Sequence, residues 1–236
     1  MGDYSIYFTI FNKMKVFIVM PAYNEEKIIT RVIQGLKKEK FENIIVIDDG
    51  SIDKTYDVAK QENVIVYRHP INRGLGGALG TGIKAAILED ADIIVTFDSD
   101  GQHDPKDIKK VIAPIAKGRA DVVIGSRLIN PKGMPMIRRI GNLGLNIITY
   151  VLFNIWTTDS QSGLRAFSNK AARKIEIKTN RMEVSSEIIR EIGRNKLKFK
   201  EVPIKAIYTD YSRAHGQSNL NAIKIVIKLI LKKLMR

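Results

Sequence analysis

Apolar runs alternate with amphipathic segments through residues 15–126 of this chain. Each run is continuous rather than alternating apolar and polar, which is typical of strands buried on both faces of a sheet. Strands that alternate with helices in this way form a mostly parallel central sheet with helices on both faces. The sequence therefore predicts an α/β fold, with strands at residues 16–20, 44–47, 64–67, 93–97 and 122–125.

Two side chains are predicted to cap helices between these strands. Asn24 precedes a helical pattern that runs to about Lys38, and Asp53 precedes one that runs to about Gln61. Asn and Asp favour helix N-termini because their side chains accept backbone N–H groups. The pattern predicts further helices over residues 74–89 and 105–117.

The second half of the chain is more mixed. It predicts strands near 164–167 and 197–203 and helices near 137–154, 183–194 and 218–235. No repeat and no Pro/Ser-rich linker divides the chain. We therefore expect one domain over residues 15–217, an extension at 1–14 and a basic amphipathic helix at 218–236.

Composition limits the classes of function. The chain has 236 residues, enough for one such domain with a substantial core. It contains no cysteine, which excludes disulfides and thiolate metal sites. Its net charge of +14 favours anionic partners, namely nucleic acid, an anionic membrane surface or phosphorylated substrates. No segment of the sequence is predicted to span a membrane or to act as a signal peptide.

Polar side chains follow three of the predicted strands, at the point where each strand ends. The carboxyl ends of parallel strands meet at one edge of a sheet, so these side chains are expected to converge. Carboxylate and amide oxygens suit Mg²⁺ or Mn²⁺, and such a cation suits a diphosphate. The alternative is that each residue only closes a strand or caps a helix. The residues are Tyr23, Glu25, Asp48, Asp49, Asp98, Asp100 and Gln102.

A glycine-rich run, residues 74–80, has two interpretations. It looks like a phosphate-binding loop, but it matches neither the dinucleotide-binding nor the P-loop spacing. Glycines in a helix also let it approach a neighbour closely. We expect close packing of the helix, with some backbone exposed toward a ligand.

Five motifs occur in order along the chain: Pro21-Ala22-Tyr23-Asn24-Glu25, Asp48-Asp49-Gly50-Ser51-x-Asp53-x-Thr55, Asn72-x-Gly74, Asp98-x-Asp100-Gly101-Gln102 and Gly125-Ser126-Arg127. In this order they resemble the family 2 glycosyltransferases of the GT-A fold. Two later motifs are Asp159-Ser160-Gln161-Ser162-Gly163-Leu164-Arg165 and Arg213-x-x-Gly216-x-Ser218. These resemble the polyprenyl-phosphate branch, which includes the dolichol-phosphate mannose synthases. The resemblance covers about residues 15–220.

The resemblance implies a role for each matching residue. The base and ribose of a nucleotide sugar would be held by Pro21, Tyr23, Glu25, Ile47 and Asp49. The metal ion and the diphosphate would be held by Asp98, Asp100 and Gln102, with Ser99 beside the sugar. Phosphates of the donor and the acceptor would face Arg127, Arg139 and Arg213, with Ser162 at the acceptor phosphate. Asp100, Arg127 and Arg213 would act on the reacting groups.

One position departs from the branch. Lysine usually stands six residues after the arginine of the late motif, where this chain has Asn219. A phosphate contact is either lost there or supplied by Lys205 or Lys224. A lipid phosphate is already an anion and needs no strong general base. We therefore expect His103 to have a structural or helix-capping role and His215 to be the nearer substrate neighbour.

Two segments predict contact with a membrane surface. Lysines at 224, 228 and 232 form one stripe of the C-terminal segment, opposite isoleucine and leucine side chains. This pattern is typical of a helix lying on an anionic bilayer, and equally of a terminal helix packed on the core. The amphipathic segment 140–157 follows Arg138 and Arg139 and favours the membrane. We expect peripheral binding at the cytoplasmic face.

Three functions follow from these patterns. The first is inverting, metal-dependent transfer of a hexose from a nucleotide sugar to a polyprenyl or dolichyl phosphate. Mannose from GDP-mannose is favoured, and glucose from UDP-glucose comes next. The second is glycosyl transfer to a soluble or polymeric sugar. The third is a non-catalytic nucleic-acid-binding protein, which explains the charge but not the converging acids, so we expect no nucleic-acid partner.

Overall fold

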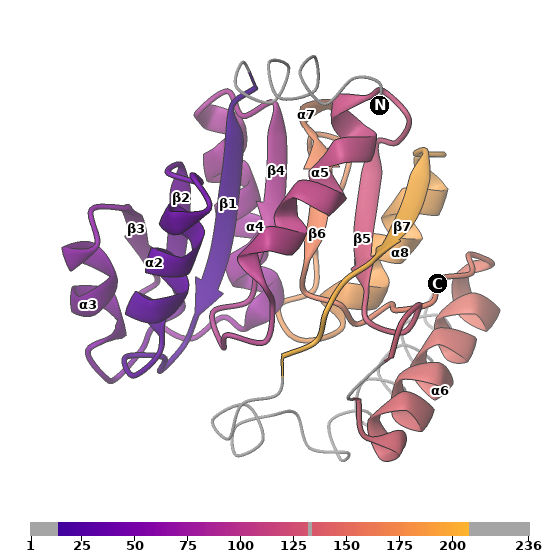
Figure 1. Cartoon of the computed structure of the whole chain (residues 1–236), viewed down its shortest axis with the longest axis horizontal. Helices are drawn as coiled ribbons and strands as arrows, with labels where there is room; N and C mark the ends of the chain where they lie inside the picture. Colours follow the sequence, from indigo (N-terminus) through magenta and orange to yellow (C-terminus); the bar gives the residue numbers. More distant parts are fainter. Residues whose placement is uncertain (1–13, 132–133, 208–236) are drawn as a thin grey trace.

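The computed structural model describes residues 14–131 and 134–207. Seven strands form a single sheet in the order β3-β2-β1-β4-β6-β5-β7 (Figure 1). All neighbouring pairs are parallel except those that β6 makes with β4 and β5. The strands are β1 (Val16–Ala22), β2 (Ile44–Asp48), β3 (Ile65–Arg68), β4 (Ile93–Thr96), β5 (Val122–Ser126), β6 (Arg165–Ser168) and β7 (Phe199–Pro203).

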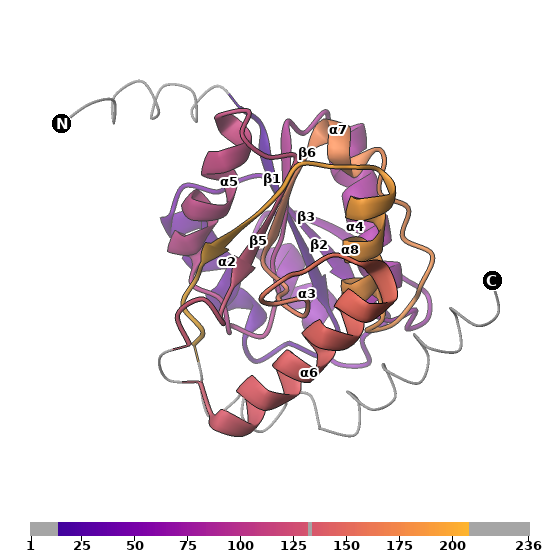
Figure 2. The same cartoon turned by 90° about the vertical axis from the view of Figure 1, so that its right-hand side faces the viewer.

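Helices cover both faces of the sheet. Figure 2 shows α2 and α5 on one side and α4, α7 and α8 on the other, and two separate apolar clusters fill these two sides. The longest helix, α6, lies across the end of the sheet where the parallel strands finish (Figures 1 and 2). The helices are α2 (Ile29–Lys38), α3 (Thr55–Gln61), α4 (Leu75–Leu88), the 3-10 turn η1 (Pro105–Asp107), α5 (Ile108–Ala116), α6 (Met136–Phe153), α7 (Asn169–Ala172) and α8 (Val184–Arg194).

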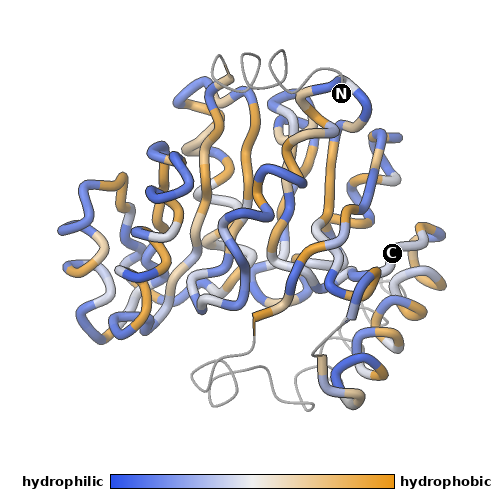
Figure 3. The backbone as a smooth tube through the Cα atoms, in the orientation of Figure 1, coloured by the Kyte–Doolittle hydropathy of each residue, from blue (hydrophilic) through white to orange (hydrophobic). Residues whose placement is uncertain are grey.

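The predicted α/β architecture is confirmed. The seven expected strands and the helices expected within the described residues all form, and the central strands are the apolar segments of Figure 3. Strands β2 and β4 are buried at every residue, as their continuous apolar sequences predicted. The second half of the chain adds β6 and β7 to the same sheet rather than forming a separate layer.

The prediction that Asn24 caps a helix is wrong. Helix α2 begins at Ile29, and Asn24 has a positive φ of 57°. Its side chain accepts a hydrogen bond from the N–H of Ile52, while its own N–H donates to the Ser51 hydroxyl. Asn24 therefore joins the loop after β1 to the loop after β2. Asp53 lies one residue before Lys54, which occupies the N-cap position of α3, but its side chain does accept the N–H of Thr55, the first residue of that helix.

The glycine-rich run packs closely, as expected. A Cβ on Gly76 would lie 1.9 Å from the carbonyl oxygen of Thr179. The N–H groups of Gly76 and Gly77, at the start of α4, both donate to the Asn180 carbonyl. These N–H groups are therefore already satisfied within the protein, which argues against a phosphate-binding loop here.

Replacing Gly76 by alanine should lower the free energy of unfolding by about 1–3 kcal/mol, because the Thr179 backbone has to move. Gly80 on the same helix is the matched control, because a Cβ there meets only Ile177 at 3.8 Å. We expect Gly80→Ala to be neutral or to stabilise by up to about 1 kcal/mol. Urea unfolding of both variants measures the difference, and equal stabilities would contradict the packing argument.

Candidate active site

Loops from three parallel strands contact one another at the carboxyl edge of the sheet. The N–H of Asp49, after β2, donates to the carbonyl of Ala22 at the end of β1, at 2.8 Å. The hydroxyl of Ser99, after β4, donates to the carbonyl of Pro21, also at 2.8 Å. The structure therefore brings together the loops that carry the predicted site residues.

Asp98 and Asp100 follow β4 and have opposite electrostatic environments. Burial opposes ionisation of Asp98, but a hydrogen bond and the positive charge of His103 more than compensate and hold its pKa below the usual range. The charges of Arg165 and Arg127 act in the same direction. By contrast, burial and the negative charge of Asp98 raise the pKa of Asp100. The two carboxylates are thus close enough to repel each other.

The donor set at this position fits a hard divalent cation. A cation between the two carboxylates would remove the repulsion that raises the pKa of Asp100. Gln102 donates its side-chain N–H to Asp100, so a metal-bound state needs the amide turned to present its oxygen. No group of three or more His, Cys, Asp or Glu side chains suited to a metal occurs in the described part of the chain. A metal here would therefore depend on Asp98, Asp100, Gln102 and oxygen atoms of its substrate.

Other predicted donor residues are placed in different ways. Tyr23 is 45% exposed at the edge, as a residue that stacks on a base has to be. The N–H of Glu25 donates to the Thr55 hydroxyl, which fixes the loop after β1. Pro21 lies in buried β1 and reaches the edge through its carbonyl. Ile47 is completely buried and packs in the apolar cluster beneath α4. No surface of Ile47 is left for a nucleotide.

Asp49 holds the loop that precedes α4. Its Oδ1 lies 2.6 Å from Nδ1 of His69 and accepts the N–H of Arg73, and its Oδ2 accepts the N–H of Gly74 at 2.6 Å. His69 also contacts the Thr81 hydroxyl through Nε2, at 3.0 Å. Asp49 therefore supports the protein's own backbone, and its contact with a ribose stays a prediction. Ser99 is similar, because its hydroxyl already donates to Pro21.

Arg127 lies in a buried ion pair. Its Nε donates to Oδ2 of Asp159 at 2.8 Å, and its terminal nitrogen donates to Oδ1 at 2.9 Å. Burial opposes ionisation of Asp159, but the charge and hydrogen bonds of Arg127 hold its pKa below the usual range. The Arg127 side chain keeps 16% of its surface exposed, so it reaches the edge of the site while its direction is fixed.

The loop that carries Asp159 is held from two sides. Glu201 of β7 accepts hydrogen bonds from Thr158, including its N–H at 2.9 Å. Asn146 of α6 donates to the Thr158 carbonyl and accepts the N–H of Ser160. Asn146 is nearly fully buried, so this side chain attaches α6 to the site. Asp159, Asn146 and Glu201 had no predicted role, although Asp159 begins a motif that the sequence already singled out.

Arg165 lies beneath the site and is fully buried. Its guanidinium donates to the Ser185 hydroxyl at 2.9 Å, while its Nε has no partner among the described residues. Burial lowers the pKa of Arg165 to about 10, opposed by the charges of Asp98 and Asp159. Arg165 ends one of the sequence motifs but had no predicted role. The available signal was an arginine at the start of an apolar strand, where charges occur only with partners.

The two predicted acceptor residues within the described chain differ. Ser162 is buried, and its hydroxyl has no partner among the described residues. Arg139 donates to the carbonyls of Met134 and Pro131, so its guanidinium fixes the turn before α6. His103 has the expected structural contacts, because it is buried edge-on against Phe97, but Nε2 also lies 3.3 Å from Asp98. Arg213, His215, Asn219, residues 1–13 of the predicted extension and the helix predicted at 218–236 lie outside the described residues.

Comparison with known proteins gives one family. The model for "Glycosyl transferase family 2" matches residues 17–176. A UDP-N-acetylglucosamine–dolichyl-phosphate N-acetylglucosaminyltransferase from Methanococcus voltae is 44% identical over 241 residues, covering 93% of this chain and 96% of that protein. A dolichol-phosphate mannosyltransferase from Pyrococcus furiosus is 30% identical over 220 residues, covering 88% of this chain and 59% of that protein.

Solved structures show the same fold. Glucosyl-3-phosphoglycerate synthase from Mycobacterium tuberculosis, in complex with Mn²⁺, UDP-glucose and phosphoglyceric acid, superposes with a TM-score of 0.69. The match covers 97% of this chain and 85% of the other, at 19% sequence identity. This similarity establishes the architecture.

Proposed function

Because the chain belongs to glycosyl transferase family 2, we propose that it transfers a sugar from a nucleotide diphosphate sugar to a polyprenyl or dolichyl phosphate. The observation that carries the proposal is the carboxylate pair Asp98 and Asp100 at the carboxyl edge, where the negative charge of Asp98 raises the pKa of Asp100 and a divalent cation would relieve this repulsion. The relatives from M. voltae and P. furiosus, both named for dolichyl-phosphate acceptors, support this class of acceptor.

The proposed chemistry is a direct displacement at the sugar C1. When bound, a Mg²⁺ or Mn²⁺ ion neutralises charge that develops on the leaving diphosphate. Asp98, Asp100 and Gln102 would hold that ion, and Arg127 would face the same phosphates from its fixed position beside Asp159. The acceptor phosphate attacks as an anion, so no protein base has to remove a proton. This displacement inverts the configuration at C1.

The identity of the nucleotide sugar that serves as donor is the more specific part of the proposal. UDP-N-acetylglucosamine ranks first because the relative named for it is 44% identical, and GDP-mannose follows because the relative named for mannose is 30% identical. This order differs from the one that the sequence motifs favoured. UDP-glucose completes the set of donors to be tested.

Helix α6 supports binding at a membrane surface. None of the helices in the described residues combines the length and apolar character needed to span a bilayer. Instead, α6 and the turn after it expose large apolar side chains near the carboxyl edge, and Tyr150 and Trp156 pack edge-on at 5.8 Å. Such a surface suits the interfacial layer of a bilayer, where a lipid phosphate is presented. The exposed residues are Met136, Ile140, Leu143, Ile147, Tyr150, Val151 and Trp156.

One experiment tests the proposal. The purified full chain is mixed with Mn²⁺ or Mg²⁺, a polyprenyl phosphate in anionic vesicles, and one radiolabelled donor at a time. We expect label in the organic phase for one donor and loss of transfer with EDTA. The same vesicles should carry the protein down on centrifugation. Transfer only to water-soluble sugars would replace the lipid acceptor, and absence of transfer from every donor would reject the proposal.

A further inference from the structure

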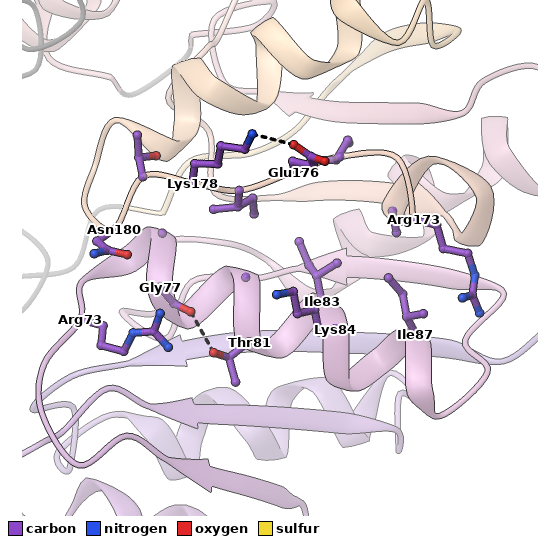
Figure 4. A pocket seen from close by; sticks show the side chains of 16 residues that line it. Arg73, Gly77, Thr81, Ile83, Lys84, Ile87, Arg173, Glu176, Lys178 and Asn180 are labelled. Carbon is purple, nitrogen blue, oxygen red and sulfur yellow. Dashed lines mark hydrogen bonds and ion pairs between the residues drawn. The ribbon is translucent and has the colours of Figure 1, made fainter. Parts of the chain in front are cut away.

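A groove of about 530 Å³ lies between α4 and the chain that follows α7 (Figure 4). Both α4 and α7 lie on the face of the sheet away from α2 and α5 (Figure 2). None of the residues proposed to hold the donor, the metal or the acceptor lines it. Its volume is in the range of small-molecule sites. The groove therefore needs an explanation separate from the transfer reaction.

Cationic side chains line the groove from end to end. Figure 4 shows Arg73 and Arg173 at opposite ends, with Lys84 between them. Lys178 is the fourth cation, and it pairs with Glu176, the only carboxylate of the lining, at 2.9 Å. Neither Arg73 nor Lys84 has an acidic partner among the described residues. The groove is therefore strongly positive.

The walls between these cations combine isoleucines and glycines with the uncharged polar residues Thr81, Thr179 and Asn180. Ile83 and Ile175 are buried within the packed structure, as are Gly76 and Gly77, and Gly80 leaves part of the helix backbone exposed. A ligand here would meet positive charge at separate points along an otherwise neutral surface. Guanidinium groups bind phosphate in a fork, and ammonium groups bind it as point charges.

Both walls are held by partly buried hydrogen bonds, so the groove is preformed. On one side, Thr81 contacts His69 at 3.0 Å, and the Arg73 N–H is held by Asp49. On the other side, Glu187 accepts the N–H groups of Lys178 and Thr179. A site that is already shaped loses little entropy when a ligand binds.

We propose that this groove binds a phosphate-bearing ligand, as a second anion site outside the transfer reaction. The phosphate belongs either to a soluble diphosphate or to a lipid headgroup, and the two share the chemistry that Arg73, Lys84 and Arg173 recognise. Four cations against one carboxylate carry the inference.

Calorimetric titration with inorganic diphosphate tests the site. The protein is the full chain with Asp100→Asn, in EDTA at fixed ionic strength, so that metal-dependent binding at the carboxyl edge does not contribute. Lys84→Glu and Arg173→Glu should each weaken binding by about tenfold, because each reverses a charge beside the anion. Lys38→Glu is the matched control, since Lys38 is exposed on α2, on the opposite face. It should leave the affinity within about twofold.

The outcomes separate the possibilities. No heat of binding in EDTA would overturn the proposal, because the groove would then bind no diphosphate. Equal weakening by all three charge reversals would also overturn it, because the overall positive charge of the protein would then account for the binding. A second arm uses vesicles with and without phosphatidic acid. Loss of phosphatidic-acid-dependent binding in the Lys84 and Arg173 variants assigns a lipid headgroup. Unchanged vesicle binding, with loss of diphosphate binding, assigns a soluble ligand.

Discussion

Replacing Asp100 by asparagine should abolish sugar transfer and at the same time make the metal-free protein more resistant to unfolding. Loss of a metal ligand removes several kcal/mol of charge stabilisation from the transition state, which corresponds to a rate at least about 1,000-fold lower. The gain in stability has a different origin. Burial and the charge of Asp98 raise the pKa of Asp100, so its ionised form is less favourable in the folded chain than in the unfolded chain.

The sign of the pH dependence follows from that raised pKa. An acid whose pKa is higher in the folded state binds its proton more tightly there, so its stabilising contribution is complete at low pH. That contribution is lost as the pH rises through the folded-state pKa. At neutral pH the raised pKa of Asp100 therefore makes its carboxyl group a cost to the folded chain that asparagine removes, with a gain on the order of 1 kcal/mol. The gain should shrink toward zero when wild type and variant are compared at acidic pH.

Urea unfolding in EDTA at neutral and acidic pH measures the stability difference, and the vesicle assay measures transfer. Asp104→Asn is the matched control, because Asp104 lies four residues away and only accepts the N–H of Lys106 at the start of η1. Asparagine keeps that cap, so activity and stability should stay close to wild type. Transfer by Asp100→Asn within tenfold of wild type, or a loss of stability at neutral pH, would contradict the assigned role.

The parallel half of the sheet could be predicted because each of its strands is recognisable from a short stretch of sequence. Apolar runs such as 93–97 mark buried strands, and the polar residues that follow them mark the edge where ligands bind. The position of β6 in the sheet cannot be predicted from its own short stretch of sequence. It runs antiparallel between β4 and β5, and that choice depends on pairings between distant segments that no periodicity encodes.

Side-chain roles were predictable only where the motif itself supplies the chemistry. The spacing of Asp98 and Asp100 predicted that the two carboxylates lie together, and in the structure they are close enough for the charge of Asp98 to raise the pKa of Asp100. The sequence around Asn24 is typical of a helix cap, but in the structure its side chain instead accepts a hydrogen bond from the N–H of Ile52. Arg127 was predicted to be a phosphate ligand, whereas the partner that fixes its direction, Asp159, is 32 residues away. Such partners follow from the tertiary fold and not from the local sequence.

Replacing Arg165 by methionine should destabilise the fold by about 3–5 kcal/mol, the largest loss expected for any single change at the site. Methionine fills a similar volume but removes the buried cation next to Asp98 and Asp159. Those carboxylates would then lie in the interior with less positive charge around them. Arg165→Lys keeps the charge and loses the bond to Ser185, so it should cost only about 1–2 kcal/mol.

A double variant distinguishes charge compensation from simple packing. If Arg165 offsets the charge of Asp98, then adding Asp98→Asn to Arg165→Met should recover part of the lost stability, because a buried charge disappears with its missing partner. If Arg165 only fills space, the two losses should add. Urea unfolding of the two single variants and the double variant gives the coupling energy directly. Removing one member of a buried charge network normally lowers stability. A methionine variant as stable as wild type would therefore show that the site does not need the positive charge of Arg165.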